Sequence, residues 1–401
     1  MVIGILRETK NPPDRRVAIT PEVALKIKNN YPQINIIVQP SEIRAFSDNE
    51  YEQKGIKLSN DLSSCDILIG IKEVAKETFI PEKTYMFFSH TAKKQPYNRA
   101  MLQKCAELNI TLIDYEFLTD ENNIRLIAFG RWAGIVGAYN TLYTYGIKNN
   151  LFKLKRAYEC FDHNELFKEV EKIKLPNIKI LLTGGGRVAN GALEVLSHAN
   201  IKQVWPEEFL TKSFDEPVFC RLDPWHYVKH KDNKPFDFTH FTKYPKEYES
   251  TFLPYALEAD VYIACHYWDP ESPVFLKPED YLHPKFHIQV IGDISCDIGK
   301  PIASTLRAST IANPIYGYNP KTKQEDVPLK PGIIAVTAID NLPAELPRSS
   351  SEDFAQTFYN KILPELLNLE KSSIIERATI LKKGKLTPRF EYLTDYLLGK
   401  E

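Results

Sequence analysis

The sequence has 401 residues and a nearly balanced charge, with 51 Lys and Arg against 52 Asp and Glu and a formal net charge of −1. This balance argues against a nucleic acid or an anionic membrane as the main partner and favours a small-molecule substrate. The length suits two domains with an active-site cleft between them, and it is compatible with a homo-oligomer.

The apolar start of the chain is too short for a signal peptide, and no later apolar run reaches membrane-spanning length. We therefore expect a soluble, cytoplasmic protein. The six cysteines lack CxxC spacing and a neighbouring histidine cluster, so the sequence predicts neither a redox pair nor a metal site.

The first part of the chain alternates short apolar runs with helical patterns, which is typical of a parallel α/β domain. A helix is expected to begin after Thr20, because Pro21 and Glu22 suit a first helical turn. The expected strands are residues 2–6, 34–39, 67–71, 85–88 and 110–114.

Residues 129–145 are expected to form a helix with Gly130, Ala133, Gly134, Gly137 and Ala138 along it. Such small side chains permit close approach to another backbone or to a cofactor. We expect this helix to cross between two Rossmann-like α/β domains with parallel sheets. The expected division is 1–138 plus 345–401 for the substrate domain and 139–344 for the dinucleotide-binding domain.

The second α/β domain is expected to start with a charged helix over 161–174 and to continue with a strand, a turn and a helix. Residues 210–255 have no clean period and suggest an insertion or ordered loop over the cleft. An amphipathic helix over 351–369, interrupted near Pro364, should return to the first domain. The other expected elements are a strand at 178–183, a turn at 184–191, a helix at 192–198, and strands at 260–264, 287–294 and 333–336.

Gly184-x-Gly186-x-x-Ala189 matches the GxGxxG/A dinucleotide fingerprint and lies between an expected strand and an expected helix. The loop backbone, including Gly185, Arg187 and Val188, would approach a pyrophosphate at the helix N-terminus. The acid expected after the second strand, which binds the ribose hydroxyls, is displaced here to Glu207. NAD(H) is therefore favoured, and NADP(H) stays open because Arg187 could receive a 2′-phosphate.

Lys72 and His90 each follow a short apolar run that reads as a buried parallel strand. Open α/β sheets bind ligands at the carboxyl ends of their strands, so these two ionisable groups are candidates for acid/base catalysis. A lysine near other cations has a lowered pKa and can act as a base near neutral pH. Several basic groups nearby suggest a substrate with more than one carboxylate. The polar residues expected at this edge are Lys10, Arg16, Lys72, Glu73, His90, Lys93, Glu116 and Arg125.

Several motifs carry a family resemblance across nearly the whole chain. They are residues 7–10 (RETK), 16–21 (RVAITP), 72–73 (KE), 87–93 (FFSHTAK), 114–116 (DYE), 128–134 (AFGRWAG), 265–268 (CHYW), 292–297 (GDISCD) and 339–347 (IDNLPAELP). They resemble the alanine dehydrogenase and saccharopine dehydrogenase superfamily, in particular its lysine-forming saccharopine dehydrogenase and lysine-ketoglutarate reductase branch.

The resemblance implies an oxidoreductase on CH–NH bonds that interconverts saccharopine with L-lysine and 2-oxoglutarate. It implies that Lys72 and His90 are the acid/base groups and that Arg16 helps to bind substrate. It further implies that Glu73 and Glu116 tune the site's charge. Asp340 would lie near substrate and cofactor, and Asp293 on the cofactor side.

Two other readings remain open. One is an alanine dehydrogenase or another opine-type dehydrogenase, because the Lys and His pair is shared with these enzymes. The other is a non-catalytic NAD-binding component like that of transhydrogenase, although the presence of both Lys72 and His90 argues against it.

Overall fold

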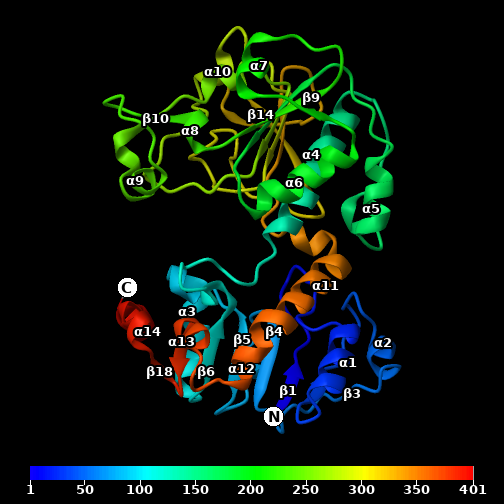
Figure 1. Cartoon of the computed structure of the whole chain (residues 1–401), viewed down its shortest axis with the longest axis vertical. Coiled ribbons are helices and arrows are strands. Elements are labelled where there is room, and N and C mark those ends of the chain that lie inside the picture. Colours follow the sequence, from blue (N-terminus) through cyan, green and yellow to red (C-terminus); the bar gives the residue numbers. More distant parts are fainter. Residues whose placement is uncertain (401) are drawn as a thin grey trace. The chain divides into compact units, whose positions relative to one another are not determined.

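The computed structural model describes residues 1–400, which fold into two compact units. The first unit contains Met1–Phe129 and the C-terminal part from Pro347 onward, and the second is Gly130–Leu346. Each unit is built on an eight-stranded, mostly parallel sheet covered by helices (Figure 1). The expected α/β class with two Rossmann-like folds is confirmed. Among the described residues, no helix is both long enough and apolar enough to cross a membrane.

The sheet of the first unit has the strand order β18-β17-β6-β5-β4-β1-β2-β3. Strands β1 to β6 run parallel, and β17 and β18 join the β6 edge in antiparallel fashion. All five strands expected in this part are present. The strands are β1 Val2–Ile5, β2 Asn35–Val38, β3 Lys57–Leu58, β4 Ile67–Lys72, β5 Thr84–Phe88, β6 Thr111–Asp114, β17 Thr379–Lys382 and β18 Lys385–Leu386.

The C-terminal helices return to the first unit, as expected, and lie alongside its parallel strands (Figure 1). Phe354, Phe358, Ile362 and Leu366 are buried against strand residues of this unit. The helix is a π-helix over Phe358–Ile362, just before Pro364, because a proline cannot donate the regular helical hydrogen bond. The helices are α1 Pro21–Asn30, α2 Asp48–Glu52, α3 Pro96–Glu107, α11 Pro347–Thr357, α12 Leu363–Leu367, α13 Ser373–Ala378 and α14 Thr394–Leu398.

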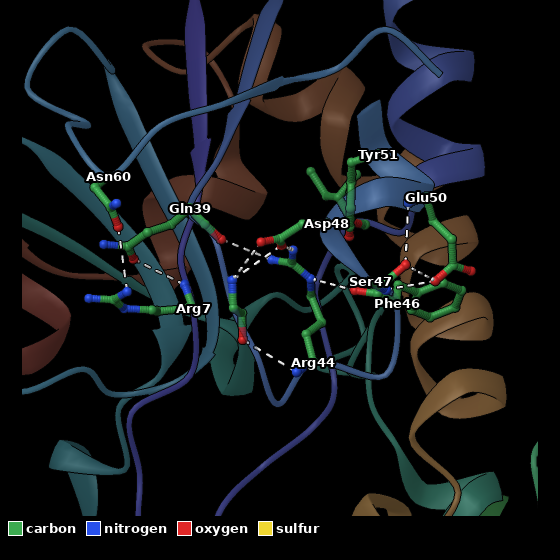
Figure 2. Close-up of polar contacts among 11 residues, drawn as sticks. Arg7, Gln39, Arg44, Phe46, Ser47, Asp48, Glu50, Tyr51 and Asn60 are labelled. Carbon is green, nitrogen blue, oxygen red and sulfur yellow. Dashed lines mark hydrogen bonds and ion pairs between the residues drawn. The ribbon is translucent and has the colours of Figure 1, made fainter. Parts of the chain in front are cut away.

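A polar network fixes the chain where β1 and β2 end (Figure 2). The Arg7 backbone N–H donates to Gln39 Oε1 at 3.1 Å, which extends the pairing of the two strands. The buried Arg44 guanidinium donates to the carbonyl oxygens of Gln39 and Phe46 and to the Asp48 carboxylate. The Arg7 bond ties the segment after β1, which carries Lys10 and Arg16, to the end of β2, whereas the Arg44 bonds order the segment after β2.

The sheet of the second unit has the strand order β15-β14-β16-β13-β12-β7-β9-β8, in which β14 and β15 are antiparallel. A separate hairpin is formed by β10 Val228–His230 and β11 Tyr248–Ser250. The sheet strands are β7 Lys179–Thr183, β8 Lys202–Gln203, β9 Val218–Leu222, β12 Val261–Ala264, β13 Val290–Asp293, β14 Ile315–Asn319, β15 Gln324–Asp326 and β16 Ile334–Thr337. The helices are α4 Gly130–Lys148, α5 His163–Val170, α6 Arg187–His198, α7 Pro206–Thr211, α8 Pro224–Tyr227, α9 Phe238–Lys243 and α10 Leu253–Ala256.

The structure corrects three local expectations in this unit. Residues 210–255 are not an insertion or loop region alone, because they contain the sheet strand β9, which pairs with β7 and lies second from the edge. Helix α6 begins at Arg187 rather than at residue 192, so the glycine turn is confined to 184–186. Helix α5 ends at Val170, well before Pro176.

The early start of α6 is explained by its packing against α4. A Cβ on Gly134 would lie 1.8 Å from the Val188 carbonyl oxygen, and a Cβ on Gly191 would lie 1.9 Å from the Arg131 carbonyl oxygen. Only glycine permits these two helix backbones to approach so closely. The small residues of α4 therefore serve the approach of another backbone.

Candidate functional site

Four neighbouring parallel strands of the first unit, β1, β4, β5 and β6, end at one edge of its sheet. The polar residues expected there all belong to this unit and follow these strand ends. They are Lys10, Arg16, Lys72, Glu73, His90, Lys93, Glu116 and Arg125.

Lys72 is the last residue of β4, and its backbone is held by Glu8. The two carboxyl oxygens of Glu8 accept the N–H groups of Ile71 at 2.7 Å and Lys72 at 2.9 Å. Burial and the nearby charge of Asp14 raise the pKa of Glu8 to about 8. Glu8 was not among the expected site residues, although it lies within the RETK motif.

The Lys72 amine is partly buried among other cations. Burial, followed by the charges of Arg16 and Lys10, lowers its pKa to about 8. A lysine with this pKa has both its protonated and its neutral form accessible close to neutral pH.

His90 follows β5 in a left-handed backbone conformation, with φ of 54°, and stacks on Phe88. Its position is fixed by the preceding residue, because the Ser89 hydroxyl and N–H donate to Asp114 Oδ2 at 2.5 and 3.0 Å. Burial, followed by the charge of Lys72, lowers the pKa of His90 to about 4. The imidazole is therefore neutral at neutral pH and available as a proton acceptor.

Asp114 joins the ends of β5 and β6. Its Oδ1 accepts the Glu116 N–H at 2.8 Å, while its Oδ2 holds Ser89. Burial raises the pKa of Asp114 to about 6. This buried carboxyl group, absent from the expected site residues, sets the spacing between His90 and Glu116.

Glu73 and Glu116, at this edge, each pair with cations through one carboxylate oxygen only. Glu73 Oε1 pairs with Lys10 at 2.8 Å, and Glu116 Oε1 pairs with Arg125 at 3.0 Å and with Lys93 at 3.9 Å. The second oxygen of each, Oε2, is buried without a hydrogen-bond partner among the described residues. A buried acceptor without a partner is costly, so these two oxygens are candidate acceptors for a ligand.

Arg16 is buried and forms a two-bond pair with Asp14. Its Nε donates to Asp14 Oδ1 at 3.0 Å and its Nη2 to Oδ2 at 2.6 Å. The guanidinium also stacks on the Phe129 ring, 4.3 Å from its centroid. Asp14 was not among the expected residues, and it balances the positive charge that Arg16 contributes beside Lys72.

The second unit carries the glycine loop between β7 and α6. Gly184 has φ of +108°, and a Cβ there would lie 2.6 Å from the Cys265 carbonyl oxygen, so glycine is required. A Cβ on Gly186 would meet nothing within 4 Å, which leaves the backbone accessible at the N-terminus of α6. Ala189 is fully buried in the core of this unit, Val188 is half-buried at its margin, and Arg187 is exposed.

The strand next to β7 is β9, not the short strand at 202–203, which lies at the sheet edge as β8. The residue that directly follows β9 is Asp223, and its Oδ1 lies 2.7 Å from the position of a Cβ on Gly185. Glu207 is exposed on α7. The apolar run 218–222 followed by an acid was the sequence signal for Asp223, but it lay inside a region assigned to loop.

Asp293 and Asp340, the two other acids expected in the second unit, differ in burial. Asp293, at the end of β13, is buried and accepts from Ser295 Oγ and Thr305 Oγ1, each at 2.6 Å, and from the Cys296 N–H at 3.1 Å. These bonds organise the loop after β13. Asp340 is exposed in the segment after β16.

The fold and the two strand-end sites define an α/β protein of the dehydrogenase type. Residues 4–136 match the family described as "Alanine dehydrogenase/PNT, N-terminal domain". The chain is 28% identical to the Neurospora crassa protein named saccharopine dehydrogenase [NAD(+), L-lysine-forming], over 92% of this chain and 91% of the relative. It is 29% identical to the Arabidopsis thaliana alpha-aminoadipic semialdehyde synthase over 98% of this chain. The chain is thus similar over most of its length to the lysine-forming saccharopine dehydrogenases, and residues 4–136 match the alanine dehydrogenase N-terminal family, so the resemblance carried by the motifs is confirmed.

The chain spans only part of its synthase relatives, 41% of the Arabidopsis protein and 47% of the Bos taurus one. Among solved structures, an L-alanine dehydrogenase is similar with a TM-score of 0.67 and 15% identity, over 99% of this chain and 100% of that one. A transhydrogenase from Sinorhizobium meliloti has a TM-score of 0.62 and 13% identity, over 96% of this chain and 100% of that one. These two likenesses support the fold.

Proposed function

We propose that this chain catalyses the reversible, NAD(P)-dependent interconversion of saccharopine with L-lysine and 2-oxoglutarate. The observation that carries the proposal is the pairing of a lysine whose pKa is lowered to about 8 with a neutral histidine at one sheet edge. The printed names of the Neurospora crassa and Schizosaccharomyces pombe relatives, both lysine-forming saccharopine dehydrogenases, support the choice of substrate.

The glycine loop fits a dinucleotide. Gly184, Gly185 and Gly186 would allow the backbone to approach the pyrophosphate at the N-terminus of α6, where helix N–H groups favour negative charge. Asp223, at the end of the strand next to β7, would accept hydrogen bonds from the ribose hydroxyls, which favours NAD(H) over NADP(H). The dinucleotide, when bound, supplies or accepts the hydride.

In the oxidative direction, neutral Lys72 would accept the proton from the secondary amine of saccharopine. Once the carbon next to that nitrogen has lost its hydride, neutral His90 would remove a proton from the water that adds to the imine carbon, and it would return a proton as the carbinolamine breaks down. Protonated Lys72 and the neighbouring cations would stabilise negative charge as it develops. The reductive direction uses the same groups in reverse order.

The substrate carries several carboxylates and an ammonium group, and this edge offers partners for both. Lys93 and Arg125 would bind carboxylates, with Arg16 contributing positive charge from its buried position beside Lys72. The unpartnered Oε2 atoms of Glu73 and Glu116 would accept hydrogen bonds from the ammonium group. We place Asp340 among the substrate-binding residues as part of the same proposal.

An initial-rate panel tests the proposal. NADH and NADPH are each followed by absorbance with L-lysine plus 2-oxoglutarate and, separately, with ammonia plus pyruvate. Turnover only with lysine and 2-oxoglutarate is expected. Turnover with ammonia and pyruvate instead would identify an alanine dehydrogenase, and dinucleotide binding without turnover of any pair would identify a non-catalytic component.

A further inference from the structure

Two histidines and a glutamate meet in the segment that follows Asp223. His230 ends β10, His240 lies on α9, and Glu247 directly precedes β11, the partner strand of β10 (Figure 1 labels β10 and α9). One potential ligand atom from each residue lies within 4.8 Å of the other two. The proposed function uses none of these side chains, and the expectation of no metal site, which was drawn from the cysteine pattern, did not consider them.

The ligand atoms converge on Glu247 Oε2. His230 Nε2 lies 3.2 Å from this oxygen and His240 Nε2 lies 3.7 Å from it. The His230 side chain is only 2% exposed, whereas those of His240 and Glu247 are 35% and 47% exposed. The His230 side of the cluster is therefore buried, and the side of His240 and Glu247 is open to water molecules that can complete a coordination shell.

A hydrogen bond on the other side of the imidazole orients the His240 ring. Tyr248 OH lies 3.2 Å from His240 Nδ1 and 3.4 Å from the Asp237 carbonyl oxygen. The hydroxyl must donate to the carbonyl, so it accepts from His240 Nδ1–H, and the Nε2 lone pair of His240 is left for a ligand. A metal-binding histidine commonly donates its other N–H in this manner.

His230 would need one adjustment. Its Nδ1 accepts the Asp232 N–H at 3.0 Å, so Nε2 carries the hydrogen that is donated to Glu247. Binding of a metal at Nε2 moves the ring hydrogen to Nδ1, so the Asp232 N–H has to give up this acceptor and bond to water instead. The Asp232 carboxylate, with Oδ2 4.0 Å from Nδ1, is placed to accept that hydrogen after a small side-chain movement.

We propose that His230 Nε2, His240 Nε2 and Glu247 Oε2 bind one divalent transition-metal ion of the zinc type. Two imidazoles and one carboxylate form a three-ligand set that zinc accepts, with water in the fourth position, whereas Mg²⁺ and Ca²⁺ prefer oxygen ligands alone. The ion joins a strand, a helix and the start of the partner strand. It thereby braces the segment that begins at Asp223, without contributing a group to the reaction.

The test uses the full chain without a polyhistidine tag, treated with EDTA and then dialysed. Equilibrium dialysis against Zn²⁺ should give one ion per chain, and Co²⁺ should give visible absorption bands of a nitrogen- and oxygen-ligated ion. His240→Asn and Glu247→Gln should each weaken binding by more than about 100-fold, beyond the loss expected for an outer contact. Zn²⁺ should raise the melting temperature of the wild type but not that of His240→Asn.

His287→Asn is the matched control. His287 lies in the same unit, is half exposed and has a carboxylate nearby, with Nε2 3.8 Å from Asp260 Oδ1, but it is not part of the cluster. Its Zn²⁺ binding should equal that of the wild type. The proposal is overturned if the wild type does not bind one Zn²⁺ per chain. It is also overturned if His240→Asn and Glu247→Gln bind Zn²⁺ as tightly as the wild type does. Because binding is measured without turnover, the result is independent of the proposed reaction.

Discussion

The two units place very different residues at the carboxyl ends of their parallel strands. In the first unit this edge carries titratable groups, with Lys72 and His90 surrounded by the paired side chains of Glu73 and Glu116. In the second unit the corresponding edge carries the glycines of residues 184–186, with Asp223 close to Gly185. Under the proposed function, the same edge geometry would serve proton transfer where side chains are charged and buried, and dinucleotide binding where backbone is accessible.

This difference has an energetic basis. Burial raises the pKa of Glu8 and lowers the pKa values of Lys72 and His90, so that it favours the neutral form of each group, and close packing and hydrogen bonds are needed to hold these groups in place. A glycine loop instead supplies fixed backbone N–H groups and needs no titrating side chain. Substitutions at the first edge should therefore affect turnover, and those at the second edge should affect nucleotide affinity.

The largest effect is expected for Lys72→Met. Loss of the proton acceptor should lower kcat by roughly 10²- to 10⁴-fold, the usual contribution of general acid/base catalysis. The NADH dissociation constant, measured by fluorescence, should stay unchanged because the glycine loop lies in the other unit. Lys104→Met, which removes a lysine from α3 paired with Glu107, is the control and should keep full activity. Undiminished turnover of Lys72→Met would remove Lys72 from the mechanism.

The pH dependence of kcat/KM should follow the ionisation of Lys72. In the oxidative direction Lys72 must be neutral, so kcat/KM should rise about tenfold per pH unit below its pKa of about 8 and level off above it. Lys10→Met should move this limb to higher pH, because one charge that lowers the pKa of Lys72 is removed and Glu73 loses its partner. A limb that does not move would show that another group titrates.

Asp223→Ala and Glu207→Ala compare the two candidate ribose acids of the second unit. We expect Asp223→Ala to weaken NADH binding by about tenfold, the equivalent of one hydrogen-bonded charged contact. Glu207→Ala should leave NADH affinity nearly unchanged, since Glu207 is exposed on α7 beyond the edge strand. Isothermal titration with NADH and NADPH measures both, and the opposite ranking would restore Glu207 as the ribose partner.

At Glu8, which holds the backbone of Lys72, the expected effect is on local backbone stability. Glu8→Ala leaves the buried Ile71 N–H without an acceptor, at a cost of about 1–3 kcal/mol, and it also removes the acceptor of the partly buried Lys72 N–H. Glu8→Gln keeps one acceptor and should lie between Ala and the wild type. Hydrogen exchange at the Ile71 and Lys72 amides measures the lost protection. Unchanged exchange in Glu8→Ala would show that these amides find other acceptors. Glu107→Ala is the control and should leave the exchange rates of both amides unchanged.

Sequence patterns located the edge of the first unit well because its strands are short, apolar and bounded by polar residues. Lys72 and His90 follow β4 and β5 directly, so the strand ends could be read from the sequence. Glu8 and Asp114 escaped notice because their role is to bond backbone N–H groups of strands distant in sequence, which no local pattern encodes.

The second unit was predicted less well for physical reasons that differ between elements. Gly191 was read as part of a turn, but it lies within α6 and is there for close contact with α4. Strand β9 lay in a stretch of mixed composition, so Asp223 was not recognised as a strand-end acid. His230, His240 and Glu247 are brought together by a hairpin and a helix, and their spacing matches no local motif.

The antiparallel pairing of β17 with β6 has a consequence for synthesis of the chain. Lys383 donates its backbone N–H to Thr111 Oγ1 across 272 residues of sequence, and the whole second unit lies between them. During translation the β6 edge therefore stays unpaired while residues 130–346 are made and can fold. Unprotected strand edges promote association with other chains, so the first unit should depend more on chaperones than the second.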